Sequence, residues 1–123
     1  MMTPMLQIAT LDQIPPEGLR FRYHDGPFEE EGLLLRTRDG RVVAYKNECR
    51  HLPMPLDDRD PGVLWDDRRV HLVCSAHAAM YRPDDGLCVS GPPEGSHLRS
   101  LPILVDGERV LLDESKLGGF FNV

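Results

Sequence analysis

Long hydrophobic runs are what this sequence most clearly lacks. No stretch of its 123 residues is apolar for long enough to cross a bilayer. The chain also does not start with a charged segment followed by an apolar one, which is the pattern of a secretory signal. We therefore expect a soluble, cytoplasmic protein that does not bind to a membrane. Its length and its 41% of hydrophobic residues suffice for one domain with a core of its own.

Positive charge is also scarce. Lysine and arginine number 14 against 20 acidic residues, which gives a net charge of −6. Binding to nucleic acid depends on clustered lysine and arginine, so this balance argues against a nucleic-acid partner. The acidity suits docking onto a basic patch of another protein. The alternative is that it only aids solubility.

The usual signs of an enzyme active site are missing. The sequence has no glycine-rich dinucleotide fingerprint. Its five histidines are not spaced for an iron site of two histidines and one carboxylate. Three cysteines cannot form an even disulfide framework. One of them, Cys88, is expected to be a small buried hydrophobic residue in a strand.

The other two cysteines each stand close to a histidine. The two motifs are Cys49-Arg50-His51 and Cys74-Ser75-Ala76-His77. Two sulfur and two nitrogen ligands suit either a tetrahedral zinc site or an iron–sulfur cluster. The spacing favours a cluster in which two cysteines bind one iron and two histidines bind the other. Each iron then draws one ligand from each of two loops, so each loop must carry a cysteine and a histidine close together.

The motifs and their surroundings resemble the Rieske ferredoxin family. Its two loops read roughly Cys-x-His-x-Gly-x-x-Leu and Cys-Pro-x-His-Gly-x-x-Phe/Tyr. The matching segments here are residues 49–56 and 74–81, followed by the turn Asp84-Asp85-Gly86, the segment Gly91-Pro92-Pro93 and an apolar strand at 101–105. The resemblance implies one Rieske [2Fe–2S] cluster, bound by Cys49, His51, Cys74 and His77. It also implies that the two histidines form the exposed edge of the site, from which electrons leave.

Several neighbours of the ligands depart from the family pattern. Pro53 and Ala78 stand where the family has glycines, and Ser75 stands where it has proline. Because proline lacks an N–H and alanine disfavours positive φ, we expect a changed loop backbone and a lost amide–sulfur hydrogen bond. High-potential members carry a serine where this chain has Ala79, whereas their tyrosine is matched by Tyr81. The resemblance therefore implies a potential toward the low end of the Rieske range.

The strand pattern predicts an all-β fold. Short alternating segments with turns about every ten residues favour a small antiparallel β-sandwich or barrel, and the resemblance adds two cluster-binding loops at one tip. Asp39-Gly40 and Asp106-Gly107 each predict a hairpin, the run Glu29-Glu30-Glu31 predicts a loop, and residues 70–73 predict a strand. We expect one Rieske domain over residues 1–123, with a core at about 6–112 and a tail at 113–123.

These expectations combine into one function and two alternatives. The first is a soluble electron-transfer protein that takes single electrons from a ferredoxin reductase to a terminal oxygenase or a similar redox enzyme. Such a chain is not catalytic alone but is the electron-transfer component of an oxidoreductase system. One alternative is a small Rieske subunit that binds a large redox subunit, as in assimilatory nitrite reductase. The other is a structural module that binds zinc or has lost its cluster.

Overall fold

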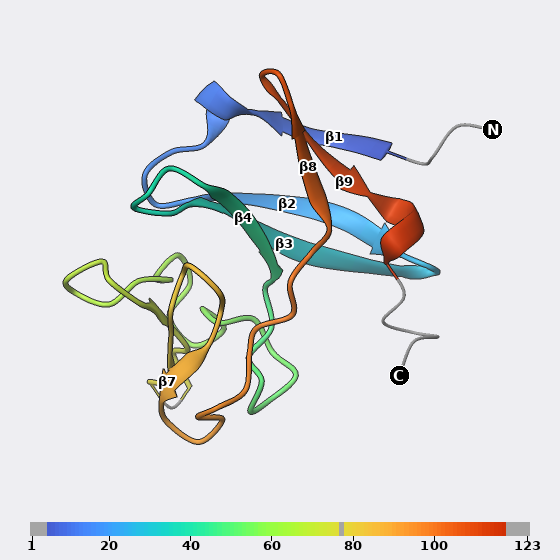
Figure 1. Ribbon diagram of the computed structural model, residues 1–123. Helices are drawn as coiled ribbons and strands as arrows, with labels where there is room; N and C mark the ends of the chain where they lie inside the picture. The colour runs from blue at the N-terminus through green and yellow to red at the C-terminus, as the bar shows by residue number, and fades with distance from the viewer. Residues whose placement is uncertain (1–4, 77, 118–123) are drawn as a thin grey trace. The chain divides into compact units, whose positions relative to one another are not determined.

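The computed structural model describes residues 5–76 and 78–117, and within them nine strands and two short 3-10 helices (Figure 1). The strands are β1 (Met5–Thr10), β2 (Leu19–Asp25), β3 (Phe28–Arg36), β4 (Val42–Lys46), β5 (Leu72–Val73), β6 (Met80–Tyr81), β7 (Cys88–Ser90), β8 (Ile103–Asp106) and β9 (Arg109–Asp113). The 3-10 helices are η1 (Leu11–Gln13) and η2 (Glu114–Lys116). None of the described helices is long and apolar enough to cross a membrane.

The chain divides into two compact units. The first consists of Met1–Ala44 together with Leu101–Val123, and the second is Tyr45–Ser100. The predicted tail falls in the first unit. It begins at the last residue of β9 and continues through η2, and its residues 118–123 lie outside the described part of the chain.

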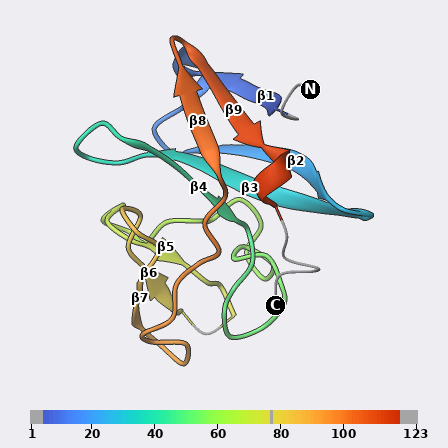
Figure 2. The same cartoon turned by 45° about the vertical axis from the view of Figure 1, so that its right-hand side comes forward.

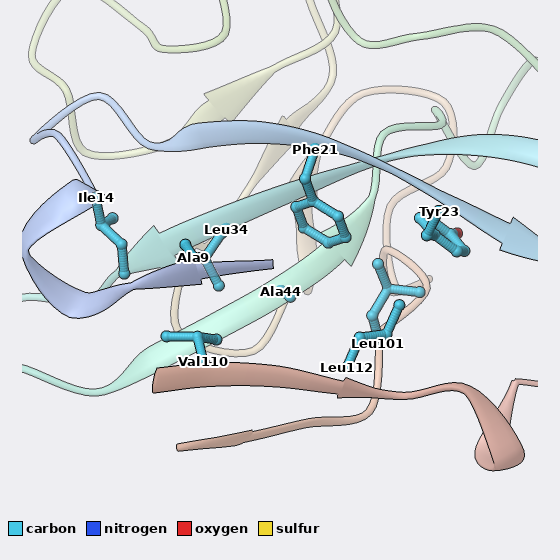
Figure 3. Close-up of a cluster of buried hydrophobic side chains, with 9 residues drawn as sticks. All are labelled: Ala9, Ile14, Phe21, Tyr23, Leu34, Ala44, Leu101, Val110 and Leu112. Atoms are coloured by element: carbon cyan, nitrogen blue, oxygen red, sulfur yellow. The ribbon is translucent and has the colours of Figure 1, made fainter. Parts of the chain in front are cut away.

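The first unit is a sandwich of two three-stranded sheets, ordered β1-β9-β8 and β2-β3-β4. The pairs β1–β9, β8–β9 and β2–β3 are antiparallel. Apolar side chains from both sheets, from the residue after η1 and from the segment before β8 form one core, drawn in Figure 3: Ala9, Ile14, Phe21, Tyr23, Leu34, Ala44, Leu101, Val110 and Leu112. Removing these side chains from water is the main force that holds the two sheets together. The predicted antiparallel all-β fold is confirmed.

Both predicted hairpins are present. The turn between β3 and β4 is closed by a hydrogen bond of 2.8 Å from the N–H of Thr37 to the carbonyl of Arg41. The turn between β8 and β9 pairs Asp106 with Arg109 and places Gly107 at a φ of +62°, which glycine adopts without steric cost.

The loop predicted at Glu29-Glu30-Glu31 is wrong, because these residues belong to β3. Their charge is compensated across the strand pair. Arg20 lies 2.9 Å from Glu31, and Arg22 lies 2.5 Å from Glu29. Opposite charges facing each other across two strands favour the pairing by roughly 0.2–1 kcal/mol. The reversal occurs earlier, at Gly26, whose φ is +62°.

The second unit contains the small sheet β5-β6-β7, labelled in Figure 2. β5 is shorter than the strand predicted at residues 70–73, because the N–H groups of Val70 and His71 donate instead to the carboxylate of Asp66, at 2.8 and 3.2 Å. The core of this unit includes Leu56, Leu72 and Tyr81, none of which is exposed. Cys88 lies in β7 and is 1% exposed, so its prediction as a buried strand residue is confirmed.

Candidate metal centre

The two ligand motifs occupy two loops of the second unit. The first ligand loop, residues 49–56, follows β4 and is closed by a hydrogen bond of 2.8 Å from the N–H of Cys49 to the carbonyl of Met54. The second ligand loop, residues 74–81, follows β5 and includes β6 at its end, and it is closed in the same way, from Cys74 to Ala79 at 2.8 Å. Each loop therefore presents its cysteine at the base of a tight reversal.

The structure brings the two cysteine side chains together. Cys49 is 4% exposed and Cys74 is 1% exposed, and the side chain of Cys74 is one of the groups that lower the pKa of the Cys49 thiol. The sulfur of Cys49 also accepts the backbone N–H of His51 at 3.4 Å. Two cysteine sulfurs sheltered from water, one of them with hydrogen-bond partners beside it, suit the cysteine-bound iron of the predicted cluster.

The electrostatics at Cys49 favour its metal-binding form. Burial alone raises the pKa of the thiol, but hydrogen bonds from Tyr81, the backbone of His51 and the side chain of Cys74 outweigh burial and lower the pKa. The thiolate is the form that binds metals. Cys88 is the contrasting case, since burial raises its pKa and keeps it a thiol.

The histidines are described only in part. His51 lies in the first ligand loop and is exposed, which agrees with a position at the edge of the site. His77, the other predicted histidine ligand, lies outside the described residues. In the part of the chain that the structure describes, no three cysteine, histidine or acidic side chains gather around one metal position. A cluster of the predicted kind takes two residues on each iron.

Tyr81 is the clearest neighbour of the cysteine sulfurs. Its phenolic oxygen lies 3.4 Å from the sulfur of Cys49 and accepts the N–H of Arg50 at 3.0 Å. Burial, followed by the hydrogen bond with Cys49, raises the pKa of Tyr81, so the phenol keeps its proton. The phenol can therefore donate this proton to a thiolate at Cys49.

The departures from the glycine pattern have different consequences. Ala78 adopts a φ of +53°, the left-handed conformation that glycine favours. The backbone at this position therefore keeps a conformation typical of glycine, whereas we had expected alanine to change it. Pro53 is exposed and has no N–H to offer, but Cys49 still receives hydrogen bonds from the backbones of His51 and Leu52. Ala79 is 1% exposed and has no hydroxyl to donate.

Sequence reasoning missed two polar residues at the ends of the first ligand loop. Asn47 and Asp57 are 5% and 7% exposed, which is unusual for an amide and a carboxylate. Their positions just before Cys49 and just after Leu56 were visible in the sequence. Their burial was not, because it depends on contacts between segments far apart in the chain.

Comparison with known proteins identifies the family. The family model described as the Rieske [2Fe-2S] domain matches residues 8–103. The iron–sulfur subunit of a toluene-4-sulfonate monooxygenase system from Comamonas testosteroni is 33% identical over 98 residues, covering 75% of this chain and 25% of that protein. A putative Rieske subunit of a respiratory nitrate reductase from Haloferax mediterranei is 30% identical over 77 residues, covering 63% of this chain and 31% of that protein. This chain thus spans less than a third of either relative.

Solved structures of similar size share the fold. The ferredoxin of carbazole 1,9a-dioxygenase from Nocardioides aromaticivorans aligns with a TM-score of 0.61 and 26% identity, covering 88% of this chain and 95% of that one. The ferredoxin of Sphingomonas yanoikuyae aligns with a TM-score of 0.65 and 17% identity, covering 89% and 98%. With the family model matching most of its length, this chain belongs to the Rieske [2Fe-2S] domain family, whose cofactor is an iron–sulfur cluster with two cysteine and two histidine ligands.

Proposed function

We propose that this protein is a one-electron carrier that receives electrons from a reductase and delivers them to an oxygenase or a similar redox enzyme. The observation that carries the proposal is the pair of buried cysteines, Cys49 and Cys74, together with the exposed His51, whose backbone N–H donates to the sulfur of Cys49. Sheltered sulfurs hold a cluster inside the chain, and an exposed histidine offers a short route out of it.

Cys49 and Cys74 hold one iron, and His51 and His77 hold the other. When bound, the cluster supplies reversible one-electron chemistry, and neutral imidazoles in place of two thiolates make it easier to reduce. The protein contributes the rest. Tyr81 and the backbone of His51 donate hydrogen bonds to Cys49, and burial keeps water from both sulfurs.

The comparisons support a carrier over the alternatives. The chain aligns over 95% of a ferredoxin that belongs to a dioxygenase, and another solved structure is a complex between an oxygenase and a ferredoxin of such a system. The two subunits of larger enzyme systems that this chain resembles are matched over only 25% and 31% of their own length. We place the carrier in the cytoplasm, as one domain over residues 1–123, without a nucleic-acid or membrane partner.

The test is the cofactor content and redox behaviour of protein purified without added metal. Iron and acid-labile sulfide are each expected at about two per chain, with a rhombic EPR signal after reduction. The reduced protein should then reduce cytochrome c with a stoichiometry of one electron per chain. One tightly bound zinc without sulfide would contradict the cofactor. A cluster that exchanges no electron with a protein acceptor would contradict the carrier.

A further inference from the structure

Two buried polar residues stand at the two ends of the first ligand loop. Asn47 precedes Cys49, and Asp57 directly follows Leu56, the last residue of the loop. Both are among the buried residues of the second unit. A buried amide or carboxylate is costly unless its hydrogen-bonding groups are satisfied, so their partners show what they hold in place.

Asn47 closes the loop with both ends of its amide. Its oxygen accepts the backbone N–H of Leu56 at 3.0 Å, and its nitrogen donates to the carboxylate of Asp57 at 3.5 Å. Asn47, two residues before the loop, is thereby fixed to the last residue of the loop and to the residue beyond it. The ends of the first ligand loop are held together independently of the metal ligands.

Asp57 extends this network to the next turn. The carboxylate oxygen that does not face Asn47 accepts the N–H of Gly62 at 2.9 Å. A single side chain thus orders the turn at residues 57–62 and holds the amide of Asn47 in the orientation that accepts from Leu56. The orientation matters, because only the amide oxygen can accept that N–H.

Ser75 connects the network to the second ligand loop. Its backbone N–H donates to the carbonyl of Leu56 at 2.7 Å, and its hydroxyl accepts the N–H of Arg59 at 2.9 Å. Ser75 directly follows Cys74, while Leu56 and Arg59 belong to the first loop and the adjoining turn. Two hydrogen bonds therefore join the two ligand loops beside a ligand cysteine.

We propose that Asn47, Asp57 and Ser75 are positioning residues that fix the two ligand loops relative to each other and so determine how firmly the chain retains its cluster. The inference rests on the proposed function, through its assignment of ligands to the two loops. Partners that act on ligands from outside the coordination shell typically change metal affinity by about 10–100-fold.

The Asn47–Asp57 pair allows a test by exchange. In Asp57→Asn, two amides face each other, and every choice of their orientations leaves two N–H donors in contact at one of the hydrogen bonds. In Asn47→Asp, two carboxylates face each other without a proton between them. In the double exchange, Asn47→Asp with Asp57→Asn, the new carboxylate accepts from Leu56 and from the new amide, whose oxygen accepts from Gly62. The donors of these three hydrogen bonds are all matched again.

The measurement is the rate at which the loaded protein loses its visible absorbance to an iron chelator without oxygen. Each single variant should lose its cluster about tenfold faster than the wild type. The double exchange should return to near the wild-type rate. Asp66→Asn is the matched control, because Asp66 also accepts two backbone N–H groups in a turn of this unit, from Val70 and His71, but bonds to none of the described residues of the ligand loops. It should leave the rate unchanged.

The Ser75 variants test the bridge without disturbing the buried pair. Ser75→Thr keeps both the N–H and a hydroxyl and should retain the cluster as the wild type does. Ser75→Ala loses the acceptor for Arg59 and should lose the cluster several-fold faster. Ser96→Ala is its control, since it removes a hydroxyl that donates to Pro93 in the same unit at 2.6 Å. The EPR spectrum of the loaded fraction should shift in Ser75→Ala and not in Ser96→Ala, which a general loss of stability would not produce.

The outcomes separate the inference from the proposed function. A wild-type protein without iron and sulfide would overturn both. A loaded protein whose single variants keep the wild-type rate, or whose double exchange is no better than the singles, would overturn the inference alone. Where a single variant fails to fold, the result rests on the double exchange and on Ser75→Ala. Equal rates for Ser75→Ala and Ser96→Ala would then overturn the inference.

Discussion

The phenolic oxygen of Tyr81 lies 3.4 Å from the sulfur of Cys49 while it accepts the backbone N–H of Arg50 at 3.0 Å. Since the N–H of Arg50 occupies a lone pair of this oxygen, the single proton of the phenol is left for the sulfur. A cluster-bound thiolate has no proton of its own, so the hydrogen bond runs from Tyr81 to Cys49. It joins the second ligand loop to the first at a proposed ligand atom.

Removing this hydroxyl should lower the reduction potential. A donated hydrogen bond favours the more negative, reduced cluster, and a bond to a charged group is worth roughly 1.5–3 kcal/mol, of which only the difference between oxidation states counts. For one electron, 59 mV corresponds to about 1.4 kcal/mol. The reduction potential of Tyr81→Phe should therefore lie below that of the wild type by an amount between tens of millivolts and about 100 mV. Voltammetry provides the measurement. Tyr45→Phe is the control, because Tyr45 is equally buried but donates to Pro83. Equal shifts in both variants would contradict the prediction.

Ala78→Gly should stabilise the protein. Ala78 holds a φ of +53°, which costs an L-residue about 1–2 kcal/mol, and glycine regains part of this after its own entropic cost of about 0.4–1 kcal/mol. The expected gain in unfolding free energy is roughly 0.5–1 kcal/mol by urea denaturation. Ala76→Gly serves as the control. Ala76 is not among the described residues with positive φ, so glycine should destabilise there. A loss of stability in both variants would refute the strain at Ala78.

The sequence was informative where a local pattern decides the structure. Asp39-Gly40 and Asp106-Gly107 predicted their hairpins because the turn chemistry lies within a few residues. The close spacing of each cysteine with a histidine predicted both ligand loops for the same reason. The acidic run in β3 was misassigned because its compensation by Arg20 and Arg22 comes from another strand.

Other features depend on contacts that no local pattern records. The burial of Asn47 and Asp57 follows from the way two loops and a turn meet. The left-handed conformation of Ala78 runs against the preference of alanine and is imposed by the loop around it. Sequence patterns therefore predicted the candidate site, whereas the groups that support its loops emerged only from the structure.

His51→Cys should keep the fold but lower the reduction potential. A thiolate in place of an imidazole adds a negative charge next to the iron, which disfavours the reduced state. Clusters with two histidine ligands lie at about −150 to +300 mV, against about −400 mV for clusters with cysteines alone, so the fall should be on the order of 100 mV or more. His71→Cys is the control, because His71 lies beside Asp66 and outside both loops. A potential that rises or stays constant in His51→Cys would argue against His51 as a ligand.

Asp85 should make stability depend on pH in the acid range. Its hydrogen bonds from Arg82 and from the N–H of Leu87 lower the pKa of the carboxyl to about 2, below the value of about 3.9 in an unfolded chain. The folded state therefore binds fewer protons, and the stabilisation is complete above pH 4 and disappears as the pH falls through 2.

The comparison of Asp85→Asn with the wild type measures this contribution. The side chain of Asp85 is 43% exposed, so the loss at neutral pH should be at most about 1 kcal/mol. In urea denaturation of the metal-free chain, the difference from the wild type should shrink steadily between pH 4 and pH 2. Asp84→Asn removes the neighbouring carboxylate and leaves the bonds of Asp85 in place, so it should show no such trend. A difference for Asp85→Asn that is constant with pH would contradict the assignment.

Gly91 should tolerate no side chain, because it packs against the second ligand loop. A Cβ at this position would lie 2.8 Å from the Cα of Ala79, and the φ of Gly91 is +103°. Gly91→Ala thus combines backbone strain of about 1–3 kcal/mol with overpacking of about 1–3 kcal/mol. Gly95→Ala separates the two costs, since Gly95 has a φ of +91° but open space around it. In urea denaturation, Gly91→Ala should lose more unfolding free energy than Gly95→Ala. It should also release its cluster faster than the wild type, because the carbonyl of the displaced Ala79 accepts the N–H of Cys74. Equal losses of unfolding free energy in Gly91→Ala and Gly95→Ala would show that the contact with Ala79 adds nothing to the cost of a side chain at Gly91.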